Sequence, residues 1–79
     1  MVFTEKNFQD RAQRLIRRIL RFANLLRNNG VPVHTANELD AIAALQFIDI
    51  NSRFEFYMAL KTTLLVSNRY FPVFDLLFL

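Results

Sequence analysis

The chain of 79 residues is long enough for one small domain, and 53% of its residues are hydrophobic, including nine Phe. The absence of Cys excludes disulfides, and a single His excludes a zinc site built from several His and Cys ligands. The net charge of +3 is unevenly distributed, because residues 11–27 contain six Arg and no acidic residue. No signal peptide and no apolar run of about 18 residues is visible, so we predict a cytoplasmic chain without a transmembrane segment.

The first predicted helix begins near residues 4–7, where Thr4 and Glu5 favour a helix N-terminus. Its apolar residues recur at steps of three and four and therefore share one face. They are Phe8, Ala12, Leu15, Ile16, Ile19, Phe22, Ala23 and Leu26. The opposite face is a candidate interaction surface that contains Arg11, Arg14, Arg17, Arg18 and Arg21.

The segment after this helix contains residues that typically end one helix and start the next. Gly30, the only glycine, follows two Asn and is predicted to end the helix with a positive φ, and Pro32 prevents the helix from resuming. Thr35 and Glu38 form a Thr-x-x-Glu capping box, which predicts that the second helix starts at about Ala36.

The second predicted helix covers residues 36–48, with Leu39, Ile42, Ala43 and Gln46 on its inner face. A second capping box, from Ser52 to Glu55, predicts a third helix over residues 53–66. Apolar residues cover most of the circumference of this third helix, so we predict that it is the central one.

The C-terminal residues predict a turn over 67–69, an extended Phe71 before proline, and a short fourth helix with Pro72 at its first position. The apolar end of the chain provides a candidate oligomer or domain-packing surface of Phe71, Phe74, Leu77 and Phe78. We therefore expect the isolated chain to form a homo-oligomer. The prediction is an all-α bundle of three full helices and a short fourth, forming one domain over 1–79 that is the N-terminal part of a longer protein.

No residue pattern indicates catalysis. His34 lies in a predicted connector with Thr35 as its only neighbouring hydroxyl, which does not make a nucleophile–base pair. Glu38 and Asp40 are two positions apart on a helix and therefore do not face each other. One glycine cannot build a phosphate-binding loop. We predict no enzymatic activity, no cofactor and no metal.

The arginine face is open to three interpretations. It is a solvated or protein-facing surface, a nucleic-acid stripe, or a membrane-surface helix. The first interpretation is favoured over the other two. Aromatic residues for base stacking are not interleaved with the arginines, since Phe8 and Phe22 belong to the apolar stripe. A globular helix with an apolar core stripe shows the same pattern as a membrane-surface helix.

The order of residues in most of the chain resembles the helical N-terminal region of CoxE-like proteins that contain a von Willebrand factor A (VWA) domain. The resemblance rests on Leu25-Leu26-Arg27, Gly30-Val31-Pro32-Val33, Glu38, Asp40-Ala41, Ala44-Leu45, Ile48-Asp49-Ile50, Arg53, Phe56, Ala59-Leu60-Lys61, Thr63-Leu64, Pro72, Phe74-Asp75 and Leu77-Phe78.

This resemblance implies a non-catalytic protein-interaction region. In that family the region precedes a VWA domain with an Asp-x-Ser-x-Ser metal motif, and members act beside a MoxR-type AAA+ ATPase in metalloenzyme maturation. The 79 residues contain no Asp-x-Ser-x-Ser, so the metal site is not carried over to any residue. The implied partners are the VWA domain, the ATPase or a client protein. The alternative is a small basic helical module that binds nucleic acid or an anionic membrane surface.

Overall fold

The computed structural model describes the backbone of residues 5–79 and the side chains of residues 9–79. Its four α-helices are α1 (Glu5–Asn28), α2 (Thr35–Ala44), α3 (Arg53–Leu64) and α4 (Phe71–Phe78), with short 3-10 helices η1 (Leu45–Phe47) and η2 (Asn68–Tyr70). This described part of the chain contains no strand. The predicted all-α bundle of three full helices and a short fourth is confirmed, while Thr4 and the side chain of Phe8 lie outside the described residues.

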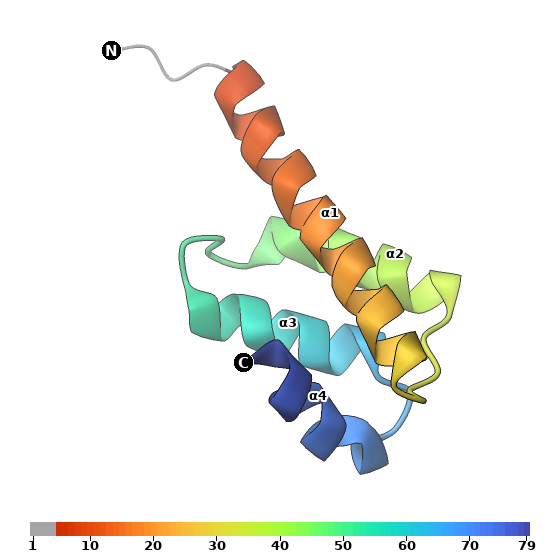
Figure 1. The fold of residues 1–79 in the computed structure, drawn as a ribbon. Helices are drawn as coiled ribbons and strands as arrows, with labels where there is room; N and C mark the ends of the chain where they lie inside the picture. Colours follow the sequence, from red (N-terminus) through yellow and green to blue (C-terminus); the bar gives the residue numbers. More distant parts are fainter. Residues whose placement is uncertain (1–4) are drawn as a thin grey trace.

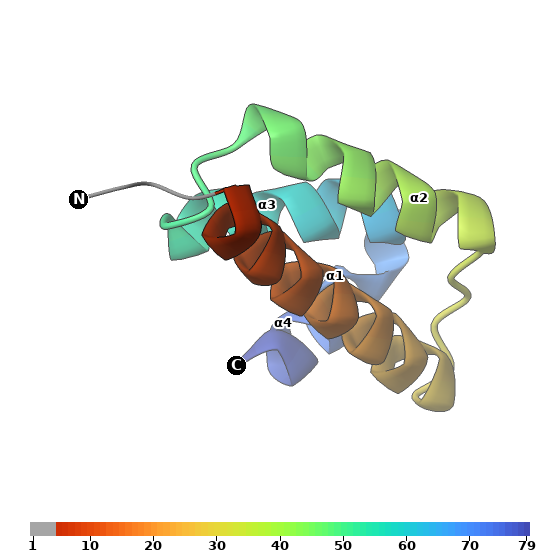
Figure 2. The same cartoon turned by 90° about the horizontal axis from the view of Figure 1, so that it is seen from above.

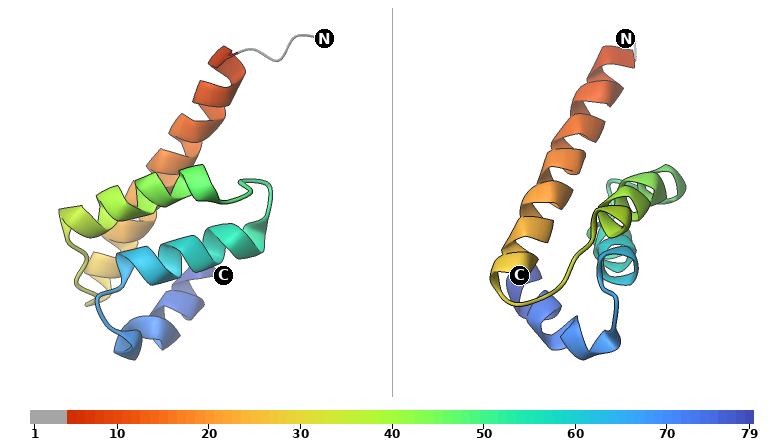
Figure 3. Two further views of the ribbon diagram at one scale, coloured as in Figure 1. Left: turned by 180° about the vertical axis from the view of Figure 1, so that it is seen from behind. Right: turned by 90° about the vertical axis from the view of Figure 1, so that its right-hand side faces the viewer.

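The α2 and α3 helices lie side by side and run in opposite directions (Figure 1). The C-terminal half of α1 packs against α2 and α4, and the view from above shows α1 crossing the other helices (Figure 2). The N-terminal half of α1 projects beyond them, which is clearest in the two views of Figure 3. The molecule is therefore elongated, with extents of 46 × 21 × 19 Å.

The apolar stripe of α1 forms one wall of the core, as its spacing predicts. Ile19, Ala23 and Leu26 are fully buried. The other elements complete the core with Val31, Val33, Ala41, Phe56, Leu60, Leu64, Leu65 and Phe74. No buried polar or charged residue occurs among the described side chains, so burial of apolar surface is the main stabilising contribution.

The junction after α1 matches the prediction for Gly30, whose φ is +84°. The Val31 N–H donates to the Leu26 carbonyl at 3.0 Å and the Gly30 N–H donates to the Arg27 carbonyl at 3.1 Å. These two bonds are those of a Schellman motif, in which a left-handed residue follows the helix and the last carbonyls find partners. Val31 and Leu26 are both buried in the core, which fixes the direction of the following connector.

The predicted capping box at the start of α2 is wrong by one residue. The helix begins at Thr35, and His34 occupies the N-cap position with φ −90° and ψ 159°. The side-chain Oδ1 of Asn37 accepts a hydrogen bond from the His34 N–H at 2.9 Å, which is the role the prediction gave to Glu38. Glu38 is instead engaged in an ion pair with Arg27. With His34 as the N-cap, Asn37 is the third residue of the helix and completes the cap in place of Glu38.

The predicted inner face of α2 is also displaced. Ala41 is fully buried, whereas Leu39 is 61% exposed. The α2 helix therefore turns the small Ala41 toward the core and not the larger Leu39. Leu39 and the following Asp40 therefore lie on the exposed side of α2.

The α3 helix begins at its predicted cap, because the Ser52 hydroxyl accepts a hydrogen bond from the Glu55 N–H at 3.2 Å. Only part of the apolar surface of α3, which the sequence predicts to be the central helix, is buried. Phe56, Leu60 and Leu64 are buried, but Phe54 is 70% exposed. Because α3 has α2 and α4 as its packing neighbours, one side of it stays open.

The prediction of an extended Phe71 is wrong. Phe71 has φ −56° and ψ −43°, and it is the first residue of α4, with Pro72 next. The 3-10 helix η2 leads directly into α4, so the helical path is already set before Pro72. This continuity outweighs the steric preference of a residue that precedes proline.

Candidate interaction surfaces

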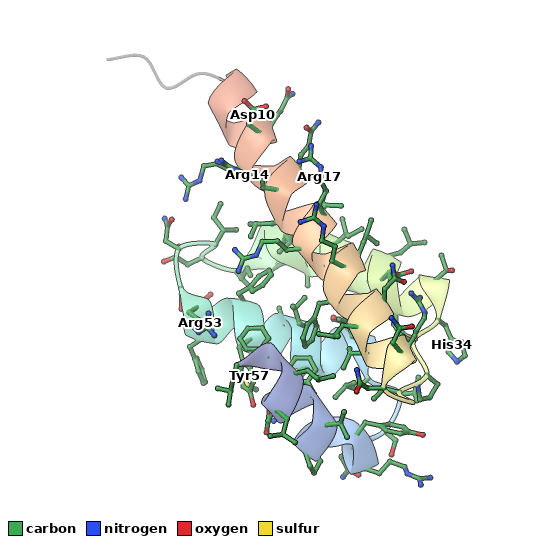
Figure 4. All side chains as sticks on the ribbon, viewed as in Figure 1. Asp10, Arg14, Arg17, His34, Arg53 and Tyr57 are labelled. Atoms are coloured by element: carbon green, nitrogen blue, oxygen red, sulfur yellow. The ribbon has the colours of Figure 1, made fainter. Side chains whose placement is uncertain are left out.

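The five arginines of the predicted interaction surface all lie on α1 and are exposed: Arg11, Arg14, Arg17, Arg18 and Arg21. Arg14 and Arg17 leave the helix on different sides (Figure 4). The two ion pairs among the described side chains are Arg27–Glu38 and Lys61–Asp75, so none of the five is neutralised by a carboxylate there. This surface keeps its positive charge available to a partner.

A groove lies between α1 and the segment that joins η1 to α3. Its basic part, about 300 Å³, is lined by Arg11, Arg14, Leu15, Arg18 and Ile50. An adjoining apolar hollow of about 180 Å³ shares Leu15 and Ile50, and a third hollow of about 160 Å³ extends the groove to Arg53. We call this feature the arginine groove. Arg17 and Arg21 are not part of its lining, so the structure divides the predicted surface into two parts.

Two contacts fix the walls of the arginine groove. The Arg11 guanidinium donates a hydrogen bond to the side-chain oxygen of Asn51. The Arg18 guanidinium lies 5.9 Å from the centre of the Phe56 ring, within the range of a cation–π contact. The first contact joins the N-terminal half of α1 to the connector before α3, and the second joins α1 to α3 itself.

The four residues of the predicted C-terminal surface have different environments. Phe74 is 0% exposed and is surrounded by Phe22, Tyr57 and Phe78, so it belongs to the core of its own chain and to no outer surface. Phe71, Leu77 and Phe78 are half-buried. The inward placement of Phe74 has a physical reason: Phe22 of α1 offers its ring edge-on at 5.2 Å, a favourable aromatic geometry.

The exposed apolar surface at this end lies instead around a pocket between α3 and α4. The pocket has a volume of about 540 Å³ and is lined by Arg53, Phe54, Tyr57, Asp75, Phe78 and Leu79. Phe54 is 70% exposed and Leu79 is 95% exposed. Arg53 and Tyr57, both labelled in Figure 4, are four residues apart on α3 and line the same pocket. We call this feature the α3–α4 pocket.

A polar network of Tyr57, Lys61 and Asp75 connects α3 with α4, and two of its members, Tyr57 and Asp75, line the α3–α4 pocket. The Tyr57 hydroxyl donates a hydrogen bond to the Asp75 carboxylate, and Lys61 Nζ donates to the Tyr57 oxygen at 2.7 Å and to Asp75 Oδ1 at 3.1 Å. The hydrogen bond to Tyr57 and the attraction to Asp75 raise the pKa of Lys61 above its ordinary value. Hydrogen bonds from Tyr57 and Lys61 lower the pKa of Asp75 below its ordinary value. Both groups are therefore charged at neutral pH, and the network joins α3 to α4.

The residues that the sequence analysis considered for catalysis do not form a catalytic group with one another in the described structure. His34 is exposed at the start of α2 and has no nucleophile beside it among the contacts described, and Glu38 is paired with Arg27. Within residues 9–79, no group of three His, Asp or Glu side chains is placed to hold a metal ion. No helix in the described part of the chain has both the length and the apolar character needed to cross a membrane.

Sequence reasoning missed the Tyr57–Lys61–Asp75 network and the Arg27–Glu38 ion pair. A signal for half of the network was present, since Tyr57 and Lys61 are four residues apart and must share a helix face. The participation of Asp75 depends on how α4 docks against α3, which no local spacing reveals.

The structure thus defines a small all-α bundle with a basic groove and an apolar pocket. In a comparison with known protein families, residues 19–79 match the CoxE N-terminal helical bundle domain. Because the match covers most of the chain, the chain belongs to this family, and the resemblance seen in the sequence is confirmed. No curated protein and no solved structure matches the chain.

Proposed function

We propose that this domain is a non-catalytic protein-interaction region of a CoxE-like VWA protein, and that it acts in the cytoplasm with a MoxR-type AAA+ ATPase in metalloenzyme maturation. Membership of the CoxE N-terminal family supports the proposal. The observation that carries it is the α3–α4 pocket, where Phe54 and Leu79 remain mostly exposed beside a folded core. Contiguous apolar surface on a small domain is typical of a site that another protein covers.

The proposed occupant of the pocket is the VWA domain of the CoxE-like protein, with the ATPase bound to the resulting unit. The test titrates the domain with a purified VWA domain of this family and with the MoxR-type ATPase of the same genome, using calorimetry. Phe54→Ser should weaken binding of the VWA domain at least tenfold, since a large exposed aromatic side chain is a typical interface anchor. Phe47→Ser is the matched control, because Phe47 is 85% exposed and is not part of the pocket lining.

Equal losses for Phe54→Ser and Phe47→Ser would overturn the role of the pocket. Absence of binding to both the VWA domain and the ATPase at micromolar concentration would overturn the proposed function itself.

The second candidate function is a basic module for nucleic acid or an anionic membrane surface. It is supported by the exposed arginines of α1. Such binding would fall steeply as the salt concentration rises, because phosphate contacts release counterions. Binding of duplex DNA or anionic vesicles that persists at about 0.15 M salt would place this candidate first.

A further inference from the structure

We infer that the arginine groove is a docking site for an acidic, amphipathic segment of a partner protein. The inference rests on the proposed function, which it deepens by giving the chemistry of one partner segment and the place where it binds. It concerns a different surface from the α3–α4 pocket. The family match begins at Ile19, so Arg11, Arg14 and Arg18 lie outside the matched residues and family membership does not account for them.

The first argument is charge. Arg11, Arg14 and Arg18 of α1 line the basic hollow, and Arg53 is among the residues that line the adjoining one. The ion pairs of the described side chains involve none of these four arginines. Like charges held this close raise the local positive potential, and a partner with carboxylates relieves that repulsion while gaining charge-assisted hydrogen bonds.

The second argument is the shape of the floor. Leu15 and Ile50 contribute to all three hollows of the groove, and both are half-buried. The apolar hollow beside them is lined by Ala12, Ile16, Ile42 and Leu45 as well. An occupant therefore needs apolar side chains directed at this floor and acidic side chains directed at the arginines.

These two requirements select a protein segment over the other anionic partners. A nucleic-acid backbone satisfies the arginines, but it offers no apolar side chain for the Leu15–Ile50 floor. Among the described residues that line the groove, within 9–79, Phe56 is the one aromatic residue, and at 8% exposure its ring is not open for base stacking. The floor is also recessed between α1 and the connector, whereas a membrane-surface helix needs its apolar side chains to project outward.

The spacing of the arginines fits a helical partner. Arg11, Arg14 and Arg18 are separated by three and four residues, so they follow one edge of α1 over about 10 Å. Carboxylates at steps of three and four on a partner helix repeat at the same interval. The same helix presents apolar residues along its adjoining face, which is the usual geometry of helix-in-groove recognition.

The test uses the full 79-residue chain and a fluorescein-labelled peptide of about 16 residues, long enough for four helical turns, built from Glu, Leu and Ala with Leu on one helical face. Fluorescence anisotropy at about 0.15 M salt measures Kd. Two comparison probes are a scrambled peptide of the same composition and a polyglutamate of the same charge. The amphipathic peptide should bind at least tenfold more tightly than either.

Two double variants distinguish binding in the arginine groove from non-specific attraction to the basic α1 helix. Both variants lower the net charge by the same amount. Arg14→Gln with Arg18→Gln removes charge from the groove and should raise Kd at least tenfold. Arg17→Gln with Arg21→Gln removes the same charge from α1 outside the groove and should raise Kd less than threefold. Ile50→Ser alters the floor and should reduce the preference for the amphipathic peptide over polyglutamate. Circular dichroism confirms that each variant is folded. If Arg14→Gln with Arg18→Gln is not folded, the single variant Arg14→Gln is compared with Arg17→Gln instead.

Several results would overturn the inference. Equal losses for the two double variants would mean that the whole basic helix attracts acidic chains without a defined site. Equal binding of polyglutamate and the amphipathic peptide would show that the floor is not used. Tighter binding of duplex DNA or anionic vesicles than of the peptide would assign the groove to another class of partner. Because Phe54→Ser leaves the groove unchanged, failure of the VWA-domain titration and failure of the peptide titration are distinguishable.

Discussion

Arg27 in the last turn of α1 forms an ion pair with Glu38 in the first turn of α2, with 3.0 Å between Nη2 and Oε1. The same guanidinium donates through Nε to the carbonyl of Val33 at 2.8 Å. One side chain thus joins the end of α1, the connector and the start of α2. The Glu38 side chain is 13% exposed, so its partner partly compensates for lost contact with water.

Loss of this ion pair should destabilise the bundle. We expect Glu38→Gln to lower the free energy of unfolding by about 1 kcal/mol, because the pair is partly shielded from solvent. The control is Asp40→Asn, which removes an acidic group from the exposed side of the same helix and should change stability by less than about 0.5 kcal/mol. Urea denaturation measures both. Equal losses would show that the pair contributes no more than an exposed charge.

The start of α2 gives a second test. Asn37 accepts a hydrogen bond from the His34 N–H at 2.9 Å and donates to the Thr63 carbonyl of α3 at 3.1 Å. Asn37→Ala should therefore cost about 1–2 kcal/mol. Thr35→Ala should cost less than about 0.5 kcal/mol, because Thr35 is the first helical residue and does not cap the helix. Thermal unfolding followed by circular dichroism compares the stability of the two variants. A larger loss of stability for Thr35→Ala than for Asn37→Ala would support the Thr-x-x-Glu capping box in place of the His34 cap.

Gly30 tests the turn after α1. A Cβ added at this position would have no heavy atom within 4 Å apart from those of the adjoining residues, so the cost of Gly30→Ala arises from the positive φ. Gly30→Ala should destabilise by about 1 kcal/mol, and Gly30→Asn by less, since Asn tolerates the left-handed conformation better. Equal stability of Gly30→Ala and the parent chain would contradict the Schellman motif.

The Tyr57–Lys61–Asp75 network predicts a dependence of stability on pH. The folded-state pKa of Asp75 is lowered, so its contribution is present above about pH 4 and is lost as the pH falls through the folded pKa. The pKa of Lys61 is raised, so its contribution is present below about pH 10 and is lost as the pH rises through the folded pKa. Chemical denaturation between these limits should show no change from this network.

The variant Asp75→Asn tests the predicted loss of stability at acidic pH. Its stability should fall less steeply than that of the parent chain below about pH 4, since the depressed carboxyl group is gone. Asp49→Asn, at an exposed position in the connector before α3, is the control. Parallel acid profiles for Asp75→Asn and the parent chain would exclude Asp75 as a source of the pH dependence.

Self-association is the fifth prediction. Phe54, Leu76 and Leu79 leave apolar surface open on α3 and α4, with Leu76 73% exposed. A second copy would cover this surface, so we expect the isolated chain to be oligomeric at micromolar concentration. Light scattering should show a mass that falls to that of a monomer in Leu76→Ser with Leu79→Ser. A monomeric parent chain would contradict the prediction.

The sequence predicted those elements that depend on neighbours along the chain. The steps of three and four in α1 place Ile19, Ala23 and Leu26 in the core, and Gly30 adopts the positive φ that its position requires. Ser52 caps α3 for the same reason, because its partner Glu55 is three residues away. In each case the determining contact lies within about one helical turn.

The errors arise where a distant residue changes the local preference. The α2 helix starts one residue earlier than predicted, so Asn37 completes the cap, and Glu38 pairs with Arg27 across the junction. Phe74 has an ordinary place in an apolar run, and only the docking of α4 against Phe22 makes it a core residue. The arginines were visible as a helical face, but their division into groove and outer residues depends on Ile50, which is far away in the sequence.

Arg53 lies at the boundary of both surfaces. It lines the arginine groove and also the α3–α4 pocket, where its guanidinium lies 4.9 Å from the centre of the Phe78 ring. A carboxylate that draws this guanidinium toward the groove removes it from Phe78, and an apolar side chain that fills the pocket competes for the same ring. Occupancy of the two surfaces is then thermodynamically linked. By reciprocity, the factor by which the first partner changes the affinity for the second equals the factor by which the second changes the affinity for the first.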